Sequence, residues 1–502
     1  MMPRPVLGID FGTTNTSAAW IDHKRTLRVV PVSERSAVLP TVVWFRARDK
    51  HVVGSNARTQ LIDDPTHTIH GFKRFLGRSL KSSFVQRHRE RFLYPLVPDE
   101  LGLCAVEIYG QVVHLREVAT LVLRRIAELA QAAAGAPFED CVLTVPAHYG
   151  YTQRRELARA ASDAGLRVRA LVNEPTAAAL FAAKKRGIEQ TLLIYDLGGG
   201  TFDVSVVAVR GALASVLATG GDAFLGGADF DEQIGRRLIE RFEVARGLDV
   251  QSNKVVMQRV FLAAEAAKIA LSTQEETTLR VPFVCSGADG QFVDFEYTLI
   301  RDALETLTSN LIERTLGACD EALKHAGMTR DDVDELVFVG GQTRMLPLKR
   351  RLSAAFKNDP TKAINPELAV AVGAAILGHS MDLPAGPDLV DVVSIPIGVV
   401  LPGGAMHEVI PRNTGVPCRR GTSVSPPVAR GQDLVMGLIQ AVELHSVERE
   451  LVGLLRVPAD WLQQNPGPLQ LELVVEQDFS LKASVARSER RRLDLPILPP
   501  PI

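Results

Sequence analysis

Apolar and polar residues alternate along the first 380 residues in a way that predicts strands and helices in turn. Short apolar runs predict strands at 6–9, 141–145, 191–195, 204–209 and 336–339. Longer segments predict helices at 115–134, which ends before Gly135, and at about 365–380, which opens with Asn365-Pro366. The alternation of the two element types indicates an α/β fold for residues 1–383.

The pattern changes after Met381. The Pro, Gly and Asp content of residues 384–394 is typical of an interdomain linker. Over residues 395–486 short β-like runs alternate with Pro and Gly turns, which predicts an all-β domain of the sandwich type. Residues 487–502 combine an arginine cluster with a proline-rich end, and we expect this tail not to be packed.

One pattern occurs twice in the first 383 residues. Residues 6–21 and 192–207 each contain an apolar strand, an aspartate (Asp10 or Asp196), a glycine-rich turn with threonine, and a second strand. A tight hairpin turn would explain either segment alone, since Asp and Gly are common in turns. The repetition of the whole pattern favours two related lobes that face one another.

The glycine-rich turns are the candidate chemistry of the chain, because it has no Gly-Lys dipeptide and therefore no P-loop. In the turns Gly12-Thr13-Thr14-Asn15 and Gly198-Gly199-Gly200-Thr201 the backbone can aim several N–H groups at phosphate oxygens. Asp10 and Asp196 precede these turns. Two carboxylates facing one polyphosphate suit Mg²⁺, which keeps most of its water ligands.

Composition narrows the functional classes. The hydrophobic fraction is 46% and the charged fraction 23%, as in a globular protein, and 57 basic against 58 acidic residues give a net charge of −1. This balance argues against a general nucleic-acid binder. The longest uncharged stretches, 368–381 and 392–407, are shorter than the ~18 residues of a membrane span. Five scattered cysteines without a C-x-x-C motif and the lack of an apolar leader predict a cytoplasmic protein.

Several motifs in one order carry a family resemblance. They are GIDFGTTNTSAA, VLTVPAHYGYTQRRELARAASDAGLRVRALVNEPTAAAL, IYDLGGGTFDVSVV, GGDAFLGGADFD, and VFVGGQTRMLPLKRRL with INPELAVAVGAAILG. Together they resemble the seventy-kilodalton heat-shock chaperones (DnaK-like) of the actin-like ATPase superfamily. The resemblance implies a two-lobed actin-like ATPase domain, followed by an all-β sandwich domain that binds peptides.

The resemblance also implies residue roles. Lys73 would reach the γ-phosphate of ATP, and Glu174 would lie near the metal and the attacking water. Asp10 and Asp196 would hold Mg²⁺ largely through water. The remaining implied ATP contacts and catalytic groups are Gly12, Thr13, Thr14, Asn15, Gly198, Gly199, Gly200, Thr201, Gly226 and Gly227. Without the resemblance, Lys73 beside Arg74 would be interpreted as surface charge.

Spacing suggests an adenosine side. Glu265, Lys268 and Ser272 fall on one helical face, where they could hydrogen-bond a ribose and a purine edge. Gly340-Gly341 would permit close approach of the base, and Arg344 could stack on the purine. A solvated Glu–Lys pair is the alternative for the helix.

The resemblance further implies that Pro146, Arg154 and Asp391 transmit the nucleotide state to the second domain. His148 stands where the family usually has another residue, and we expect a surface or packed histidine. Asp388 replaces an apolar linker position and predicts weaker coupling, Pro402 predicts an altered peptide groove, and the family's helical lid is expected to be absent. The tail segment RRRLDLPIL could occupy a peptide groove.

The leading hypothesis is an ATP-dependent chaperone that binds extended apolar segments of unfolded client polypeptides, with J-domain co-chaperones and an exchange factor as implied partners. No nucleic acid or membrane partner is expected. The alternatives are a regulator of a single client, a nucleotide-dependent scaffold, and a small-molecule kinase of the same superfamily. A kinase would have no use for the β domain after Ile395.

Overall fold

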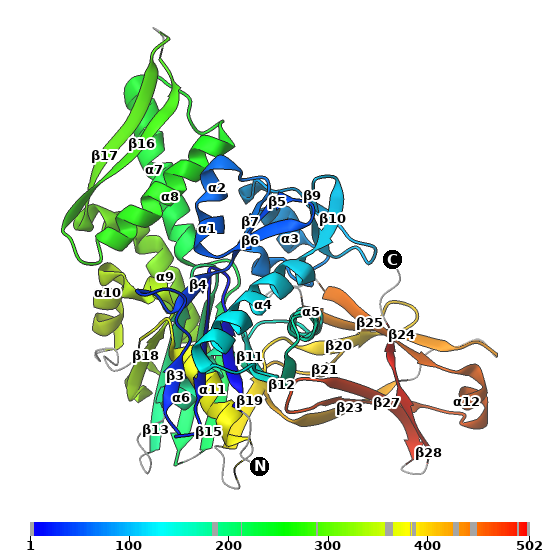
Figure 1. The fold of residues 1–502 in the computed structure, drawn as a ribbon. Coiled ribbons are helices and arrows are strands. Elements are labelled where there is room, and N and C mark those ends of the chain that lie inside the picture. The colour runs from blue at the N-terminus through cyan, green and yellow to red at the C-terminus, as the bar shows by residue number, and fades with distance from the viewer. Residues whose placement is uncertain are drawn as a thin grey trace.

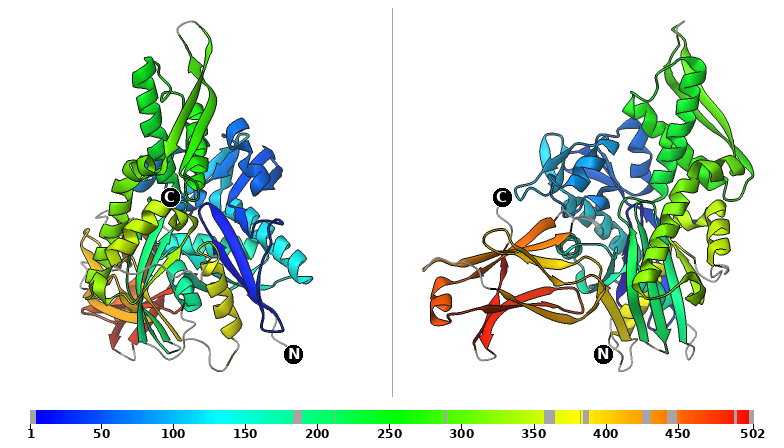
Figure 2. Two further views of the ribbon diagram at one scale, coloured as in Figure 1. Left: turned by 90° about the vertical axis from the view of Figure 1, so that its left-hand side faces the viewer. Right: turned by 180° about the vertical axis from the view of Figure 1, so that it is seen from behind.

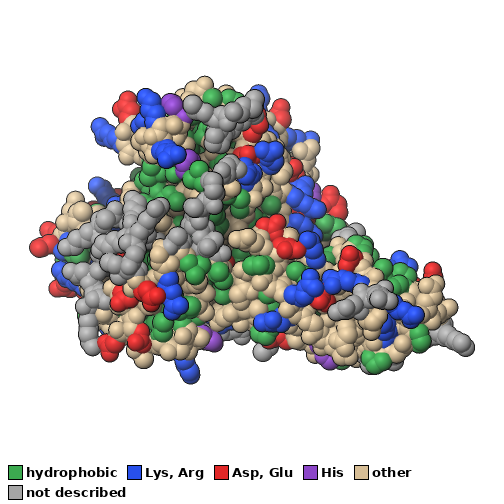
Figure 3. Space-filling view, turned by 90° about the horizontal axis from the view of Figure 1, so that it is seen from below, with side chains coloured by type: hydrophobic (Ala, Val, Ile, Leu, Met, Phe, Trp, Pro, Cys, Tyr) green, Lys and Arg blue, Asp and Glu red, His purple; other side chains and the backbone are tan. Residues whose placement is uncertain are grey.

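The computed structural model describes residues 5–182, 189–211, 213–287, 290–356, 365–381, 383, 388–424, 431–441, 449–488 and 491–498. They form two α/β lobes and a β region that follows the lobes in the sequence (Figure 1). No helix within these ranges is long and apolar enough to cross a membrane. Basic and acidic side chains are interspersed on the face seen from below (Figure 3).

Lobe I is built on the sheet β12-β11-β1-β2-β3, with β4 paired to β2. Strand β1 is parallel to β11 and antiparallel to β2. Alternate β1 residues Leu7, Ile9 and Phe11 pack into the hydrophobic cluster beneath α4 and α5, because side chains of a strand alternate between the two faces. The bounds are β1 Leu7–Phe11, β2 Asn15–Ile21, β3 Leu27–Val29, β4 Val38–Pro40, β11 Asp140–Val145, β12 Arg167–Asn173, α4 Leu115–Ala134 and α5 Tyr151–Asp163.

The upper part of lobe I consists of two small sheets, β5-β6-β7 and β8-β9-β10, and short helices. It carries η1, the short 3-10 helix that holds Lys73. The bounds are β5 Val42–Ala47, β6 Lys50–Val53, β7 Thr68–His70, β8 Leu96–Pro98, β9 Cys104–Ile108, β10 Gln111–His114, α1 Ser55–Arg58, α2 Gln60–Asp63, α3 Ser83–His88, η1 Phe72–Arg74 and η2 Arg89–Arg91.

Lobe II is built on the sheet β18-β13-β14-β15, which β19 and β22 extend. Helices α7 and α8 and the hairpin β16–β17 rise above this sheet (Figure 2). The bounds are β13 Glu189–Leu197, β14 Phe202–Arg210, β15 Leu213–Asp222, β16 Glu276–Ser286, β17 Phe292–Ile300, β18 Glu335–Val339, α7 Gly227–Arg246, α8 Lys254–Ala270, α9 Arg301–His325, α10 Leu346–Phe356, η3 Arg330–Asp332 and η4 Gly341–Arg344.

The repeated sequence pattern forms equivalent hairpins in the two lobes. In lobe I, β1 pairs with β2 and with the parallel strand β11; in lobe II, β13 pairs with β14 and with the parallel strand β18. Helices α6 (Glu174–Ala182) and α11 (Ala369–Ser380) pack against one another between the sheets. A Cβ atom at Gly373 would lie 1.7 Å from the Ala177 carbonyl oxygen, so this contact requires glycine.

The β region contains a five-stranded sheet, β21-β20-β24-β25-β29, and a four-stranded sheet, β23-β26-β27-β28. Inward side chains of both sheets share one hydrophobic cluster. The short helix α12 (Ala459–Gln464) lies between β25 and β26. The bounds are β20 Ile397–Val400, β21 Met406–Ile410, β22 Thr414–Val416, β23 Cys418–Val424, β24 Leu434–Ala441, β25 Arg449–Val457, β26 Leu469–Val475, β27 Leu481–Ser488, β28 Arg491–Leu495 and β29 Ile497–Leu498.

Two segments differ from the sequence expectations. The expectation of an unpacked tail is wrong for residues 491–498, because β28 pairs with β27 and β29 pairs with β25. These pairings also contradict a tail free to enter a peptide groove. In the expected linker, residues 388–393 form β19 (Asp388–Val393), which pairs in parallel with β15; residues 384–387 lie outside the described ranges.

The expected helix at 365–380 begins later, as α11 at Ala369. The first residues of the expected helix form a turn instead. The side-chain oxygen of Asn365 accepts a hydrogen bond from the Glu367 N–H, and its carbonyl oxygen accepts one from the Leu368 N–H. The helix expected at 115–134 is confirmed as α4, with Gly135 in the left-handed conformation at its end.

Candidate functional site

A cleft with a volume of about 600 Å³ lies where the two lobes meet. Both glycine-rich turns and the four charged residues expected around the phosphates line this one cavity. The lining residues are Asp10, Gly12, Thr13, Thr14, Asn15, Ser17, Val38, Lys73, Glu174, Asp196, Gly198, Gly199, Gly200, Thr201, Val339, Gly340, Gly341, Pro366 and Glu367. The sequence prediction of two facing turns is therefore matched by their placement in the structure.

The two turns pack directly against one another. A Cβ atom at Gly199 would lie 2.0 Å from the Thr14 Oγ1 atom, and one at Gly200 would lie 2.5 Å from the Thr13 Cγ2 atom. Side chains at either position would force the turns apart. Glycine thus sets the distance between two backbone segments whose N–H groups can bind one anion.

Lys73 is held rigidly in the cleft. Its side chain is only 2% exposed, and its Nζ atom lies 2.7 Å from the Glu174 Oε1 atom. The Tyr149 hydroxyl donates a hydrogen bond of 2.7 Å to the Lys73 carbonyl oxygen, which fixes η1 from below. The lysine is therefore a buried, oriented cation beside a carboxylate and not surface charge.

Three carboxylates share this cation. Glu174 and Asp196 are buried, and Asp10 accepts a hydrogen bond of 3.4 Å from the Thr144 hydroxyl. Loss of water and then the charge of Glu174 raise the pKa of Asp10 to about 7. Burial, followed by the neighbouring carboxylates, also raises the pKa of Asp196, and burial raises that of Glu174 in spite of Lys73. The cluster is therefore short of positive charge.

This donor set fits a magnesium ion. Mg²⁺ takes oxygen ligands and uses only one or two carboxylates besides water and phosphate. Asp10, Asp196 and Glu174 supply oxygen donors at the cavity wall, and a divalent cation would relieve the repulsion that raises their pKa values.

The glycines Gly226 and Gly227 lie behind the second turn and do not line the cavity. The Gly227 N–H donates to the Gly198 carbonyl oxygen at 2.9 Å, and a Cβ atom at Gly226 would lie 2.4 Å from the Gly200 nitrogen. The start of α7 therefore supports the second turn. The expected nucleotide contact at these two glycines stays a prediction.

The residues expected on the adenosine side also lie outside the cavity lining, with the exception of Gly340 and Gly341. The Glu265 carboxylate pairs at 2.5 Å with Arg58 of lobe I, and Lys268 pairs at 2.8 Å with Asp231. The Ser272 hydroxyl donates to the Lys268 carbonyl oxygen at 3.4 Å.

Arg344 lies next to the cavity. Its side chain is half exposed, and it pairs at 2.7 Å with Glu367, which does line the cleft. Glu265 and Lys268 lie on α8 as the spacing predicted, whereas Ser272 lies two residues beyond the end of that helix. The sequence pattern did not identify the partners that these side chains have in the fold.

Sequence reasoning missed functional neighbours of the cleft. Arg74 contacts the second turn and Tyr149 contacts Lys73. No local sequence pattern distinguishes these two residues from arginines and tyrosines elsewhere in the chain. His148 is buried, as in the packed alternative, and its Nδ1 atom lies 2.9 Å from the Asp203 carboxylate. A buried carboxylate on β14 was not predicted as its partner.

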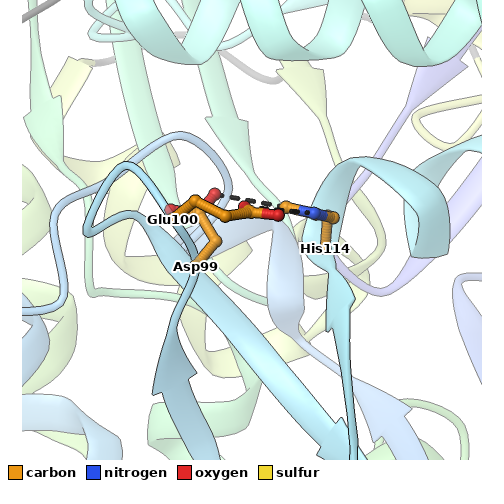
Figure 4. Close-up of side chains that lie close together, drawn as sticks. All are labelled: Asp99, Glu100 and His114. Carbon is orange, nitrogen blue, oxygen red and sulfur yellow. Dashed lines mark hydrogen bonds and ion pairs between the residues drawn. The ribbon is translucent and has the colours of Figure 1, made fainter.

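A second cluster of potential metal ligands lies on the surface of lobe I (Figure 4). The His114 Nδ1 atom lies 3.2 Å from Asp99, and its Nε2 atom lies 3.5 Å from Glu100. The carboxylates therefore face opposite nitrogens of one ring. Asp99 also accepts hydrogen bonds from the backbone N–H groups of Leu101 and Leu103. One potential ligand atom of each residue lies within 4.8 Å of the others, but exposed acidic groups commonly lie this close together without an ion.

Comparisons with known proteins place the chain in a family. The family model "Hsp70 protein" matches residues 6–452. The chain is 34% identical over 449 residues to the mitochondrial heat shock 70 kDa protein of Dictyostelium discoideum (89% of this chain, 68% of that protein). It is 34% identical over 490 residues to the corresponding protein of Solanum tuberosum (97% and 71%). It is 36% identical over 421 residues to the chaperone protein DnaK of Thermotoga neapolitana (83% and 67%).

These matches cover most of the chain and about two thirds of each relative, and residues of several family motifs, though not of GGDAFLGGADFD, line one cleft of the structure. The resemblance seen in the sequence is thereby confirmed. The chain belongs to the Hsp70 family and is an ATP-hydrolysing, ATP-dependent molecular chaperone.

Proposed function

We propose that the cleft binds ATP with Mg²⁺ through the two glycine-rich turns. The observation that carries this proposal is the convergence of both turns, Lys73 and three carboxylates on one cavity. Asp10 and Asp196 would hold the hydrated ion, with Glu174 beside them. When bound, the ion neutralises charge on the β- and γ-phosphate oxygens. Gly340 and Gly341 line the cavity where a nucleotide extends away from the turns.

Hydrolysis in this site depends on positioning and on charge stabilisation, and it needs no covalent intermediate with the protein. Lys73 would donate to a γ-phosphate oxygen, since its ammonium is buried and aimed into the cleft. Glu174, paired with Lys73 and deprived of water, is placed to orient or accept a proton from the attacking water. Thr13, Thr14 and Thr201 line the cavity with hydroxyls that can donate to phosphate oxygens.

We propose that the β region is a separate domain that binds extended apolar peptides. The described strands of its five-stranded sheet expose four large apolar side chains, Met406 at 65%, Val435 at 42%, Leu451 at 37% and Leu498 at 37%. An extended peptide could add its backbone beside this surface. Pro402 lies in the turn between β20 and β21, and residues 425–430 lie outside the described residues.

We further propose that the linker couples the two activities. In β19, Val392 is buried against lobe II, and Asp391 accepts a hydrogen bond of 2.8 Å from Thr176 at the start of α6. Thr176 is two residues from Glu174. The linker therefore joins the sheet of lobe II within reach of the hydrolysis centre. The side chain of Asp388 lies outside the described set, so its predicted weakening of coupling stays a prediction.

Arg154 supplies a second connection. Its guanidinium donates to the Asn173 side chain at 2.6 Å, next to Glu174, and to the Tyr149 carbonyl oxygen at 3.0 Å. The same group stacks on Phe479 of the β region, 4.2 Å from the ring centroid. Gln440 accepts a hydrogen bond of 2.7 Å from the Tyr151 backbone. Pro146, which accepts from the Tyr149 N–H, begins this loop.

The test follows release of a fluorescent, extended apolar peptide in Mg-ADP and in Mg-ATP, with ATP hydrolysis measured alongside. We expect faster release in Mg-ATP. Lys73→Ala should slow hydrolysis about a hundredfold, since it removes one charge that stabilises the transition state. Arg124→Ala, a surface change on α4, is the matched control. Peptide binding without nucleotide dependence would refute the coupling, and unchanged hydrolysis in Lys73→Ala would refute the assigned site.

Client polypeptides, J-domain co-chaperones and an exchange factor remain the proposed partners. The match to chaperones along most of the chain does not favour a single-client regulator, a scaffold or a small-molecule kinase. Location in the cytoplasm stays a prediction; a reducing compartment suits the five cysteines, all of which are free thiols.

A further inference from the structure

Arg74 follows Lys73 on η1 but its side chain reaches the other lobe. Its Nη2 atom donates to the carbonyl oxygen of Gly200 at 2.7 Å and lies 3.2 Å from the Asp229 carboxylate. Gly200 belongs to the second glycine-rich turn, and Asp229 lies in the first turn of α7. Of these two adjacent residues of η1, Lys73 therefore contacts the hydrolysis centre and Arg74 contacts the opposite wall of the cleft.

Phe224 holds this guanidinium from the lobe II side. The residue lies between β15 and α7 of lobe II, yet it is buried in the hydrophobic cluster of lobe I. The Arg74 guanidinium carbon lies 3.9 Å from its ring centroid. His88 stacks on the ring at 3.5 Å, and Phe84 packs edge-on at 5.6 Å. The aromatic ring is thus inserted between lobe I side chains and carries the start of α7 with it.

His88 acts in this stack as a neutral ring. Burial, and then the charges of Arg91 and Arg74, lower the pKa of His88 to about 4. A neutral imidazole can stack on Phe224 without repelling the neighbouring guanidinium. The local charge is therefore provided by the two arginines, which share Asp229 as their acceptor.

The shape of the turn depends on this contact. A Cβ atom at Gly200 would lie 3.0 Å from the Arg74 Nε atom, so the guanidinium approaches the bare Gly200 backbone closely. The Nε atom is buried without a hydrogen-bond partner. The start of α7 holds the other side of the turn, because the N–H of Ala228 donates to the Gly199 carbonyl oxygen at 2.9 Å. A guanidinium suits this position because it can stack and donate at once, which an ammonium cannot do in the same way.

We propose that Arg74 is a positioning residue for ATP hydrolysis: it fixes the second glycine-rich turn to lobe I. The Phe224 ring orients the Arg74 guanidinium. The proposal rests on the proposed nucleotide site. Arg74 does not act on the reacting atoms. It sets where the backbone N–H groups of Gly199, Gly200 and Thr201 meet the phosphates, and small displacements of such groups cost large factors in rate.

The experiment measures single-turnover hydrolysis at saturating Mg-ATP and the dissociation rate of a fluorescent ADP, using the full chain. We expect Arg74→Ala to lower the saturated rate constant at least about tenfold and to raise the ADP dissociation rate. Arg74→Lys keeps the charge but cannot both stack and bridge Gly200 to Asp229, so we expect a loss of at least about fivefold. Phe224→Leu, which keeps an apolar side chain, should give a smaller loss in the same direction.

Arg91→Ala is the matched control, because Arg91 contacts Asp229 and the Phe224 ring but not the turn. We expect it to change the saturated rate less than threefold. Thermal unfolding checks that each variant is folded; a merely structural role would lower the melting temperature and leave the saturated rate unchanged. A folded Arg74→Ala or Arg74→Lys with the wild-type rate, or an equal loss in Arg91→Ala, would overturn the proposal. Failure of the nucleotide site itself would show separately, as wild-type hydrolysis insensitive to Lys73→Ala.

Discussion

The two halves of the cleft differ in how their charged groups are satisfied. On the phosphate side, three carboxylates share a single lysine, and burial raises their pKa values. On the adenosine side, Glu265, Lys268 and Arg344 each already have a partner of opposite charge in the protein. The first half has one cation for three carboxylates. The second pairs its charges one to one, although burial also raises the pKa of Asp231, the partner of Lys268, to about 7.

This difference predicts where nucleotide binding gains its free energy. A cation and a polyphosphate brought to the phosphate side complete an arrangement that is unfavourable without them. A ribose or purine on the adenosine side must replace or share existing ion pairs. The Glu265–Arg58 and Arg344–Glu367 pairs are partly exposed and contribute little, while the Lys268–Asp231 pair is buried. We therefore expect large effects from the phosphate side and small ones from the adenosine side.

The largest effect is expected at Asp196. Asp196→Asn removes one oxygen charge from the cluster and should weaken binding of Mg-ATP about 10- to 100-fold, the usual range for groups around a metal site. Binding of ATP in the presence of a chelator should change much less. Titration calorimetry with and without Mg²⁺ makes the comparison. Equal losses under both conditions would contradict a role in holding the ion.

A pH effect should follow from Asp10. Its pKa is about 7 in the folded state against an ordinary value of 3.8, so between these values the folded state holds a proton that the unfolded state has released. Stability without nucleotide should therefore fall as the pH rises from about 4 to 7.

The control for this pH effect is Asp10→Asn, which cannot titrate. The melting temperature of the wild type relative to this variant should decline over that pH interval, as followed by circular dichroism. A difference that is constant with pH would show that Asp10 is ionised in the empty protein.

A smaller effect is expected at Arg344. Arg344→Ala removes a half-exposed guanidinium and should weaken ATP binding by about two- to fivefold, which corresponds to an exposed cation–π contact. Binding of inorganic triphosphate, which has no base to stack, should not change. The same loss for triphosphate would place Arg344 on the phosphate side instead.

The smallest effect is expected at Glu265. Its ion pair with Arg58 joins α8 to α1 across the cleft, with side chains 23% and 35% exposed. Glu265→Gln should speed ADP release by up to about fivefold, because such pairs contribute about 0.2–1 kcal/mol. Stopped-flow release measures this change, and Arg58→Gln should reproduce it without adding to it in the double variant. Additive effects would contradict a direct pair.

Local patterns were sufficient to predict part of this site. The strands that carry Asp10 and Asp196 were predicted because apolar runs before glycine-rich turns need only nearby residues. The neighbours of Gly200 were not predictable in the same way, since Arg74 and Gly226 approach it from distant parts of the chain. Lys73 was assigned through family resemblance, and only the fold shows why an adjacent arginine is also buried.

The C-terminal strands show the opposite error. The arginines of residues 489–492 suggested an unpacked tail, yet Leu493, Leu495 and Ile497 alternate with polar positions or proline and pack against the core of the β region. The period-two pattern was present in the sequence. The partner of Ile497 in β25 lies about 40 residues earlier, and pairing at that distance was not visible in the local pattern. Leu493 and Leu495 pair with the adjacent strand β27, so this hairpin could have been predicted from the local pattern.

The most direct test of the unbalanced phosphate side compares the melting temperatures of the wild type and Asp196→Asn, with and without Mg-ATP. Removing a buried, repelled carboxylate should raise the melting temperature of the empty protein. The same change should lower the melting temperature in saturating Mg-ATP, because the ion loses a partner. Opposite signs under the two conditions are the predicted result. A decrease under both conditions would contradict the account, since Asp196 would then be a structural residue already satisfied in the empty protein.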